Sequence, residues 1–202
     1  MSEGVVHVID DDAAMRDSLG FLLQVNRIPY RLFESAVAFL EDLPPSGDGC
    51  VLTDVRMPEL SGIEMLKLLQ ERGYRDPVIV MTGHADVPLA IEAMKAGVVD
   101  FIEKPFDDDI LLTAIREALE RSRLQRGEDR ALADVRDRLE SLSRREQEVL
   151  EGVVEGRSNK VIAFDLGISP RTVEIYRAAV MTKMRARSLS ELVRMVLSTR
   201  GG

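Results

Sequence analysis

The sequence predicts a doubly wound α/β domain with a five-stranded parallel sheet, followed by a linker helix and an all-α domain of four helices. Three observations lead to this prediction. Short apolar runs alternate with amphipathic stretches over residues 1–120, and a charged stretch with one apolar seam covers 121–139. The pattern from 140 to 202 is wholly helical. Strand and helix in alternation are typical of a parallel sheet with helices on both faces.

Five short apolar runs are the expected strands. Four of them are rich in valine and isoleucine and nearly unbroken by charge, which is typical of strands buried on both faces. The run at 31–33 is shorter and more polar, which suits an edge strand. The five runs are Val5–Ile9, Arg31–Phe33, Cys50–Thr53, Val78–Met81 and Val98–Ile102.

Between and after these runs, apolar residues recur at helical spacing. Met15, Leu19, Leu22 and Leu23 form the first such group, and similar groups lie at 37–40, 63–69, 89–94 and 110–118. Each group provides one apolar stripe that a helix can lay against a sheet. These groups therefore predict the covering helices of the first domain.

The segment 121–139 is rich in arginine and acidic residues. Leu132, Val135, Leu139 and Leu142 follow one another at spacings of 3, 4 and 3. This seam fits a short coiled coil. It fits equally a solvated linker helix whose one apolar stripe packs on its own domain, and the sequence leaves both interpretations open.

Start signals mark the helices of the last segment. Ser143 with Glu146, and Ser188 with Glu191, have the spacing of a capping box. Ser169 precedes a proline at the first helical position, and Ser158 or Asn159 can cap another helix. These signals predict four helices between 140 and 202.

Composition excludes several classes of protein. The single cysteine, Cys50, and two histidines leave no disulfide framework and make a zinc site improbable. No apolar run reaches the ~18 residues of a membrane span, and the first residues lack the basic region of a secretory signal. We therefore expect a cytoplasmic protein without a membrane partner.

Charge is unevenly spread along the chain. The net charge is −8, with 16 basic and 27 acidic residues in 1–139, a balance of −11, against 11 and 8 in 140–202, a balance of +3. Such asymmetry suggests two units with different partners.

Polar residues gather where the expected strands end. Asp10 and Asp11 end the first, Asp54 the third and Thr82 the fourth, and Lys104 follows the fifth. Carboxyl ends of parallel strands form one ligand-binding edge, at the point where strand order reverses. Clustered carboxylates repel one another unless a cation joins them, and hard oxygen ligands suit Mg²⁺. A carboxylate there can attack phosphorus, with the lysine neutralising phosphoryl oxygens.

These residues resemble a known family. Val8-Ile9-Asp10-Asp11-Asp12, Asp54-Val55-Arg56-Met57-Pro58, Met81-Thr82-Gly83-His84 and Phe101-Ile102-Glu103-Lys104-Pro105-Phe106 are similar to the motifs of the receiver domain of two-component response regulators, which has a flavodoxin-like fold. The resemblance covers residues 1–120 and implies a sensor histidine kinase as partner. The implied roles are phosphoacceptor for Asp54, Mg²⁺ ligands for Asp10 (through water), Asp11, Asp54 and the Arg56 carbonyl, phosphoryl partner for Lys104, and switch pair for Thr82 and Phe101.

The other end of the chain predicts a helix-turn-helix. Residues 158–174 read as helix, short turn with glycine, and helix. The segment from Pro170 to Arg187 contains five basic residues and one acidic residue, a balance of +4. A basic helix face that is only solvated would have the same composition. If the helix from Pro170 enters the major groove, its first residues lie nearest the bases. The candidates are Arg171, Glu174, Ile175 and Ala178 for bases, and Lys160, Thr172, Arg177 and Lys183 for phosphates.

The pattern from Leu142 to Val173 resembles the LuxR-type DNA-binding domain. With the receiver-like segment in front, the whole chain resembles the FixJ subfamily of NarL/FixJ response regulators, and Glu174-Ile175-Tyr176-Arg177 fits it well. The resemblance implies a transcription factor that binds double-stranded DNA and RNA polymerase and forms a homodimer on phosphorylation. It implies no conventional enzyme, beyond the receiver's own phosphoryl transfer and dephosphorylation. The implied domains are 1–120 (receiver), 121–139 (helical linker) and 140–202 (DNA-binding).

Two alternatives remain at this point. One is a DNA-binding regulator that works without phosphorylation, in which the carboxylate set should be incomplete. The other is a phosphohydrolase with an aspartyl nucleophile in Asp10-x-Asp12, although Ala14 stands where such enzymes usually carry threonine or valine. Among neighbouring residues, Cys50 and His7 are expected in the core, Asp12 as a helix cap, and His84 near the site.

Overall fold

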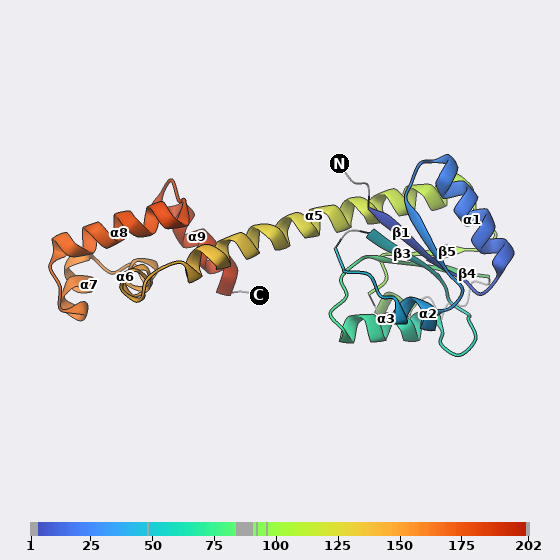
Figure 1. The fold of residues 1–202 in the computed structure, drawn as a ribbon, viewed down its shortest axis with the longest axis horizontal. Helices are drawn as coiled ribbons and strands as arrows, with labels where there is room; N and C mark the ends of the chain where they lie inside the picture. The colour runs from blue at the N-terminus through green and yellow to red at the C-terminus, as the bar shows by residue number, and fades with distance from the viewer. Residues whose placement is uncertain (1–3, 48, 84–90, 92, 96, 201–202) are drawn as a thin grey trace. The chain divides into compact units, whose positions relative to one another are not determined.

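The computed structural model describes residues 4–47, 49–83, 91, 93–95 and 97–200 (Figure 1). The chain divides into two compact units, Met1–Gly127 and Glu128–Gly202, which are described separately below. The strands are β1 (Val5–Ile9), β2 (Tyr30–Phe33), β3 (Gly49–Asp54), β4 (Val78–Thr82) and β5 (Asp100–Glu103). The helices are α1 (Ala13–Val25), α2 (Ala36–Glu41), α3 (Gly62–Glu71), α5 (Asp108–Glu140), α6 (Arg144–Val154), α7 (Asn159–Leu166), α8 (Pro170–Met184) and α9 (Leu189–Arg200).

The first unit contains the predicted parallel sheet. Its five strands lie in the order β2-β1-β3-β4-β5, and every neighbouring pair is parallel. The short, partly exposed β2 lies at the edge, as its polar composition predicts. Strand order reverses at β1, which pairs with both β2 and β3. The ends of β1 and β3 therefore lie side by side at the point where such sheets bind ligands.

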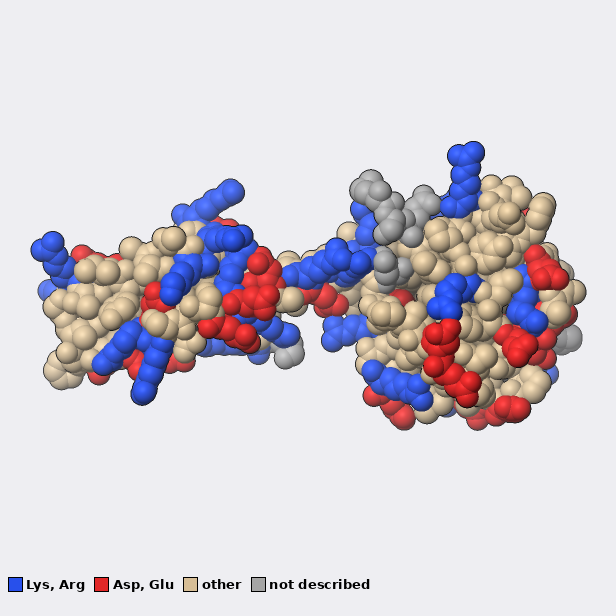
Figure 2. All heavy atoms as spheres, viewed as in Figure 1, with Lys and Arg blue, Asp and Glu red and all other residues tan. Residues whose placement is uncertain are grey.

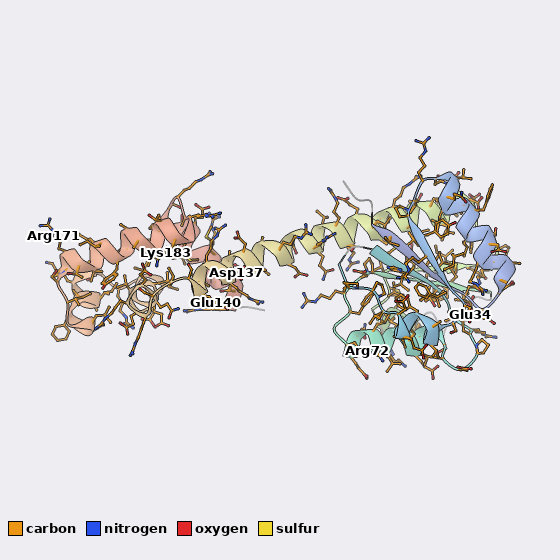
Figure 3. All side chains as sticks on the ribbon, viewed as in Figure 1. Glu34, Arg72, Asp137, Glu140, Arg171 and Lys183 are labelled. Atoms are coloured by element: carbon orange, nitrogen blue, oxygen red, sulfur yellow. The ribbon has the colours of Figure 1, made fainter. Side chains whose placement is uncertain are left out.

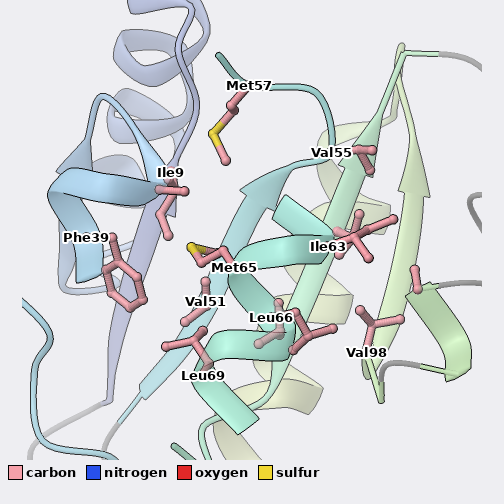
Figure 4. Close-up of a cluster of buried hydrophobic side chains, with 14 of the residues drawn as sticks. Ile9, Phe39, Val51, Val55, Met57, Ile63, Met65, Leu66, Leu69 and Val98 are labelled. Atoms are coloured by element: carbon pink, nitrogen blue, oxygen red, sulfur yellow. The ribbon is translucent and has the colours of Figure 1, made fainter. Parts of the chain in front are cut away.

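Two hydrophobic cores cover the two faces of the sheet. Successive residues of a buried strand point to opposite faces, so Val51 joins one core and Leu52 the other. Helices α2 and α3 cover the face drawn in Figure 4, where Phe39, Met65 and Leu69 pack against the sheet. Helices α1 and α5 cover the opposite face. Cys50 is fully buried in that second core, as predicted.

Local signals set the helix boundaries. The Asp12 carboxylate accepts from the backbone N–H groups of Ala14 and Met15, so Asp12 caps α1 as predicted. The strand predicted from Val98 instead begins at Asp100. The Val98 N–H donates to the Ala93 carbonyl and closes the preceding helical segment, so Val98 is not available to the sheet. Of the helical group expected at 89–94, residues 91, 93 and 94 are described, and they are helical.

His7 is a buried histidine in the middle of β1. The residue is 4% exposed, and its ring packs against the rings of Phe33 and Phe39. Burial, and next the positive charge of Arg31, lower the pKa of His7 to about 4, although Asp42 opposes the shift. His7 is therefore neutral at physiological pH and belongs to the core, as expected.

This shift predicts a pH-dependent stability. The unfolded chain binds a proton at His7 below about pH 6.5, whereas the folded chain does so only near pH 4. Between these values acidification favours unfolding, by up to about 3 kcal/mol in total. We expect His7→Leu to remove this part of the acid sensitivity, so that the wild-type protein loses stability relative to His7→Leu as the pH falls from 7 to 4.5. Parallel loss of stability in both proteins over that range would show that His7 does not titrate in this way.

Helix α5 joins both units in sequence, because it runs unbroken from Asp108 to Glu140. The boundary expected at residue 120 therefore falls inside a helix. Its first part is buried against the sheet through residues such as Leu111 and Ile115. Val135 and Leu139 pack against the core of the second unit, and Leu142 is part of that core. Within this chain, the apolar seam therefore packs on the second unit. This agrees with the second interpretation, a linker helix whose one apolar stripe packs on its own domain.

The second unit is all-helical, as predicted. Ser143 and Glu146 form the full capping box, and Ser158 and Ser169 cap α7 and α8. The Ser188 hydroxyl accepts from the Glu191 N–H, but the Glu191 carboxylate accepts from Arg187 rather than from Ser188. The expected second capping box is therefore half formed. Within the described residues, none of the helices has the length and apolar content needed to cross a membrane.

Candidate functional site

One lysine and two aspartates meet at the carboxyl edge of the sheet. The Lys104 ammonium lies 2.8 Å from Asp10 Oδ2 and 2.6 Å from Asp54 Oδ1. Asp10 follows β1, Asp54 ends β3, and Lys104 follows β5, so three separate strand ends provide the cluster. The structure therefore brings together three of the residues that the sequence predicted.

Both carboxylates are nearly removed from solvent, since Asp10 is 1% and Asp54 8% exposed. Two such charges repel each other unless a cation lies between them. Burial disfavours the charged form of Lys104, but its hydrogen bonds and charge interactions with Asp10 and Asp54 outweigh burial and raise its pKa. Lys104 is consequently charged at neutral pH and joins the two carboxylates.

Backbone N–H groups hold the remaining carboxylate oxygens. Asp12 N donates to Asp10 Oδ1 at 2.9 Å, and Arg56 N donates to Asp54 Oδ2 at 2.6 Å. Arg16 on α1 donates from Nη1 to the Asp10 carbonyl at 2.7 Å. These bonds fix the directions in which Asp10 and Asp54 present their oxygens.

Gly62 allows α3 to start against the end of β3. A Cβ at this position would lie 2.3 Å from the Asp54 carbonyl oxygen, so no other residue fits without a shift of the backbone. The Gly62 N–H donates to the Val55 carbonyl at 3.0 Å. Neither Gly62 nor Arg16 was among the predicted site residues. Ser61, which caps α3 directly before Gly62, was a usable sequence signal for the helix start. No sequence signal marked the contact of Arg16 with the Asp10 carbonyl.

Thr82 and Phe101, the residues that the resemblance implies as a switch pair, lie on the neighbouring strands β4 and β5. Thr82 ends β4 and is 3% exposed, and its carbonyl accepts from Lys104 N at 2.6 Å. Phe101 on β5 is half-buried and packs against the core beneath α3. The Lys104–Pro105 peptide is cis. His84 lies outside the described residues.

Asp11 does not join Asp10 and Asp54 in a ready-made metal site. Its side chain is exposed, and in the part of the chain that the structure describes no three acidic, histidine or cysteine side chains converge on one point. Mg²⁺ nevertheless requires only one or two carboxylates, because water completes its coordination. Asp10 and Asp54 present two such hard oxygen donors, so the donor set fits this ion.

The second candidate site lies on α8. Arg171, Glu174, Ile175 and Ala178 are all exposed, and the Ile175 side chain is 64% exposed although it is apolar. Figure 3 shows Arg171 extending into solvent at the start of the helix. The four predicted base-reading residues therefore form one open surface on the first half of α8.

The predicted phosphate-contacting residues differ in their surroundings. Lys160 is exposed, whereas Arg177 donates from Nη1 to Asn159 Oδ1 at 2.6 Å and Thr172 bonds the Ser169 hydroxyl. Lys183, at the other end of α8, lies 2.7 Å from Glu146 Oε2. Glu146 is 6% exposed, and the hydrogen bond from Lys183, followed by that from Ser143 N, lowers its pKa.

Figure 2 shows basic and acidic side chains interspersed over the visible face of each unit. Neither unit presents a uniform patch of one sign on that face. On that face, the distribution of charge therefore does not mark a nucleic-acid surface.

Comparison with known proteins agrees with this geometry. The family described as "Response regulator receiver domain" matches residues 6–116, and "Bacterial regulatory proteins, luxR family" matches 140–196. The chain is 57% identical over 192 residues to "Transcriptional regulatory protein FixJ" of Azorhizobium caulinodans, covering 95% of this chain and 91% of that protein. This chain is a FixJ-like response regulator.

Solved structures of relatives agree with this assignment. Full-length FixJ from B. japonicum is 52% identical, with a TM-score of 0.60 and coverage of 99% of this chain and 98% of that one. The response regulator StyR is 36% identical, with a TM-score of 0.87 and coverage of 98% and 100%. A FixJ-like response regulator is a two-component transcription regulator and not a conventional enzyme, which disfavours the phosphohydrolase alternative.

Proposed function

We propose that Asp54 is the phosphoacceptor and that a sensor histidine kinase is the donor. An Asp54 carboxylate oxygen forms a bond to phosphorus, the N–P bond of the phosphohistidine breaks, and the ring nitrogen leaves with the electron pair and takes up a proton. Carboxylates and the Arg56 carbonyl would hold Mg²⁺, which neutralises phosphoryl oxygens when bound. The ligands in this proposal are Asp10 (through water), Asp11, Asp54 and the Arg56 carbonyl.

Lys104 has two tasks in this proposal. Before transfer it neutralises Asp10 and Asp54, as its contacts of 2.8 and 2.6 Å indicate. After transfer it pairs with the phosphoryl oxygens, because Asp54 no longer presents a free carboxylate. The same ammonium thus serves both states of the receiver. The observation that carries the proposal is this Lys104 contact with carboxylates from two strand ends.

Thr82 and Phe101 are the proposed switch pair. A phosphoryl group adds a charge of about −1.5 to −2 and strong acceptor oxygens, to which the Thr82 hydroxyl can donate. Movement of Thr82 leaves space that the half-buried Phe101 ring can fill. The receiver thereby shifts between two populated states, and the phosphorylated state favours homodimer formation.

In the DNA-binding unit, we propose that α8 enters the major groove of an operator. Arg171, Glu174, Ile175 and Ala178 read bases, and the proposed phosphate contacts come from Lys160, Thr172 and Arg177. Lys183 is instead held by Glu146, so it is assigned no phosphate. One such unit buries little surface, so two linked units bind far more tightly than one. The bound dimer would recruit RNA polymerase in the cytoplasm and thereby activate transcription.

The test of this function measures both sites in the full chain. We expect acetyl phosphate to label the protein only when Mg²⁺ is present, and footprinting on genomic DNA to show protected sites that strengthen with the phosphodonor. Footprints on genomic DNA that are equally strong without the phosphodonor would instead support the phosphorylation-independent regulator. Absence of protection in either state would contradict the DNA-binding role.

Substitution of two lysines distinguishes a residue that contacts DNA from one that stabilises the fold. Lys160 and Lys183 carry the same charge, but only Lys183 is bound to the nearly buried Glu146. We expect Lys160→Met to reduce the slope of log affinity against log salt by about one, as loss of one phosphate contact does. Lys183→Met should leave that slope unchanged and lower the free energy of unfolding by about 1–2 kcal/mol.

The pH dependence of Lys183→Met provides a second check. Because Lys183 lowers the folded pKa of Glu146, its contribution is complete above the unfolded pKa of Glu146 and is lost as pH falls through the lower folded pKa. The difference in stability between wild type and Lys183→Met should therefore shrink on acidification. If Lys183→Met instead changes the salt slope as much as Lys160→Met, Lys183 contacts a phosphate, as the sequence alone suggested.

A further inference from the structure

The end of α8 is held by a residue from the linker segment. Arg138, near the end of α5, donates from Nη1 to the Met184 carbonyl at 3.0 Å. Met184 is the last residue of α8, and its side chain is fully buried. In Figure 3, Asp137 and Glu140 mark the end of α5 beside the end of α8 marked by Lys183.

This contact is part of the C-terminal cap of α8. The last carbonyls of a helix have no partner within the helix. The Arg185 and Ala186 N–H groups donate to the carbonyls of Thr182 and Met181 as the chain turns through the left-handed Arg185, where φ is 53°. The Met184 carbonyl is satisfied by Arg138, whose positive charge also suits the negative end of the helix dipole.

The guanidinium of Arg138 is held in position from its own helix. Asp134, one turn earlier on α5, forms an ion pair with Nη2, and the Arg138 side chain is only 19% exposed. Val135 and Leu139, from the same two turns, pack against the core that contains Met184. Rotation or fraying of this part of α5 would therefore move the group that caps α8.

We propose that Arg138 is a positioning residue for DNA recognition, which couples the state of the linker segment to the proposed recognition helix. The inference depends on the proposed role of α8. Arg138 itself touches no base or phosphate in this scheme. It sets the position of α8 from its C-terminal end, while the base-reading residues lie on the first half of the helix.

The test compares Arg138→Met with Arg136→Met in the full chain. Both variants lose one positive charge from neighbouring positions of α5, but Arg136 is exposed and forms none of the hydrogen bonds or ion pairs seen at Arg138. The probes are a duplex enriched from a random pool by the wild-type protein with acetyl phosphate, and a duplex of random sequence. Affinities are measured well below the melting temperature of each variant.

We expect Arg138→Met to bind the enriched duplex about 5- to 10-fold more weakly and random DNA within about twofold of wild type. Arg136→Met should remain within about twofold on both probes, and Arg138→Lys, which keeps a charged donor, should recover most of the loss. Hydrogen exchange should accelerate at the Arg185 and Ala186 amides and not in α6 or α7. A merely structural role would accelerate exchange throughout the unit and weaken both probes.

Equal affinity of Arg138→Met and Arg136→Met for the enriched duplex would overturn the inference, as would equal losses on both probes. If Arg138→Met does not fold, Arg138→Gln takes its place with the same expected ordering and the same overturning results. Failure of the wild-type protein to enrich any sequence would instead contradict the proposed DNA-binding function. The two failures are therefore distinguishable.

Discussion

Asp54→Asn is expected to abolish labelling by acetyl phosphate and, with it, the phosphodonor-dependent rise in DNA affinity. An amide has the shape of the carboxylate but is not a nucleophile, so labelling should slow by more than about 10²-fold. The fold should persist, because the amide oxygen of the variant can still accept from Lys104 and one of two adjacent buried charges is removed. Intact-protein mass spectrometry gives the label, and fluorescence anisotropy on a footprinted site gives the affinity.

Asp17→Asn is the matched control for this experiment. Asp17 is an exposed aspartate on α1, so its substitution removes the same charge without touching the cluster. It should label and bind like wild type. Phosphodonor-dependent binding by Asp54→Asn, at the level of Asp17→Asn, would refute Asp54 as the acceptor that gates DNA binding.

Lys104→Met is the second substitution with a large expected effect. It leaves Asp10 and Asp54, 1% and 8% exposed, without the ammonium that joins them. We expect labelling by acetyl phosphate to slow by about 10²–10³-fold, since a positioned charge on the transferring group is lost. Without divalent cation, the melting temperature should fall, because two close carboxylates repel.

Mg²⁺ should partly reverse this loss of stability. A cation that binds the folded state and not the unfolded state stabilises the fold, and Lys104→Met offers it a site with no competing ammonium. The rise in melting temperature with Mg²⁺ should therefore be larger in Lys104→Met than in wild type or in Lys95→Met, an exposed lysine that serves as control. An equal rise in all three proteins would show that Mg²⁺ does not bind beside Asp10 and Asp54.

The strands and helices could be predicted because their signals are local. Valine-rich runs mark the central strands, and the partly polar run at 31–33 correctly marks the edge strand β2. Ser143 and Ser169 mark helix starts because each side chain bonds a backbone N–H three residues on. The Val98 boundary was wrong because a hydrogen bond to Ala93, invisible in an apolar pattern, removes that residue from the strand.

The site could be predicted only as a set of strand ends. Parallel strands bring their carboxyl ends to one edge, so Asp10, Asp54 and Lys104 were expected near one another. The pattern could not show that Lys104 lies between the two carboxylates while Asp11 remains exposed. It also gave no sign that Arg16 bonds the Asp10 carbonyl, since the spacing of apolar residues does not encode which backbone group a polar side chain reaches.

The sequence alone determined the two-part architecture, the residues at each strand end and the exposed start of α8, because these follow from spacing within single elements. The tertiary structure decided which charges meet: Lys104 with Asp10 across 94 positions, Lys183 with Glu146 across 37, and Arg138 with the Met184 carbonyl across 46. Such pairings depend on how whole elements pack against one another. Two lysines that look alike in sequence can therefore have different tasks, and only the packed chain separates them.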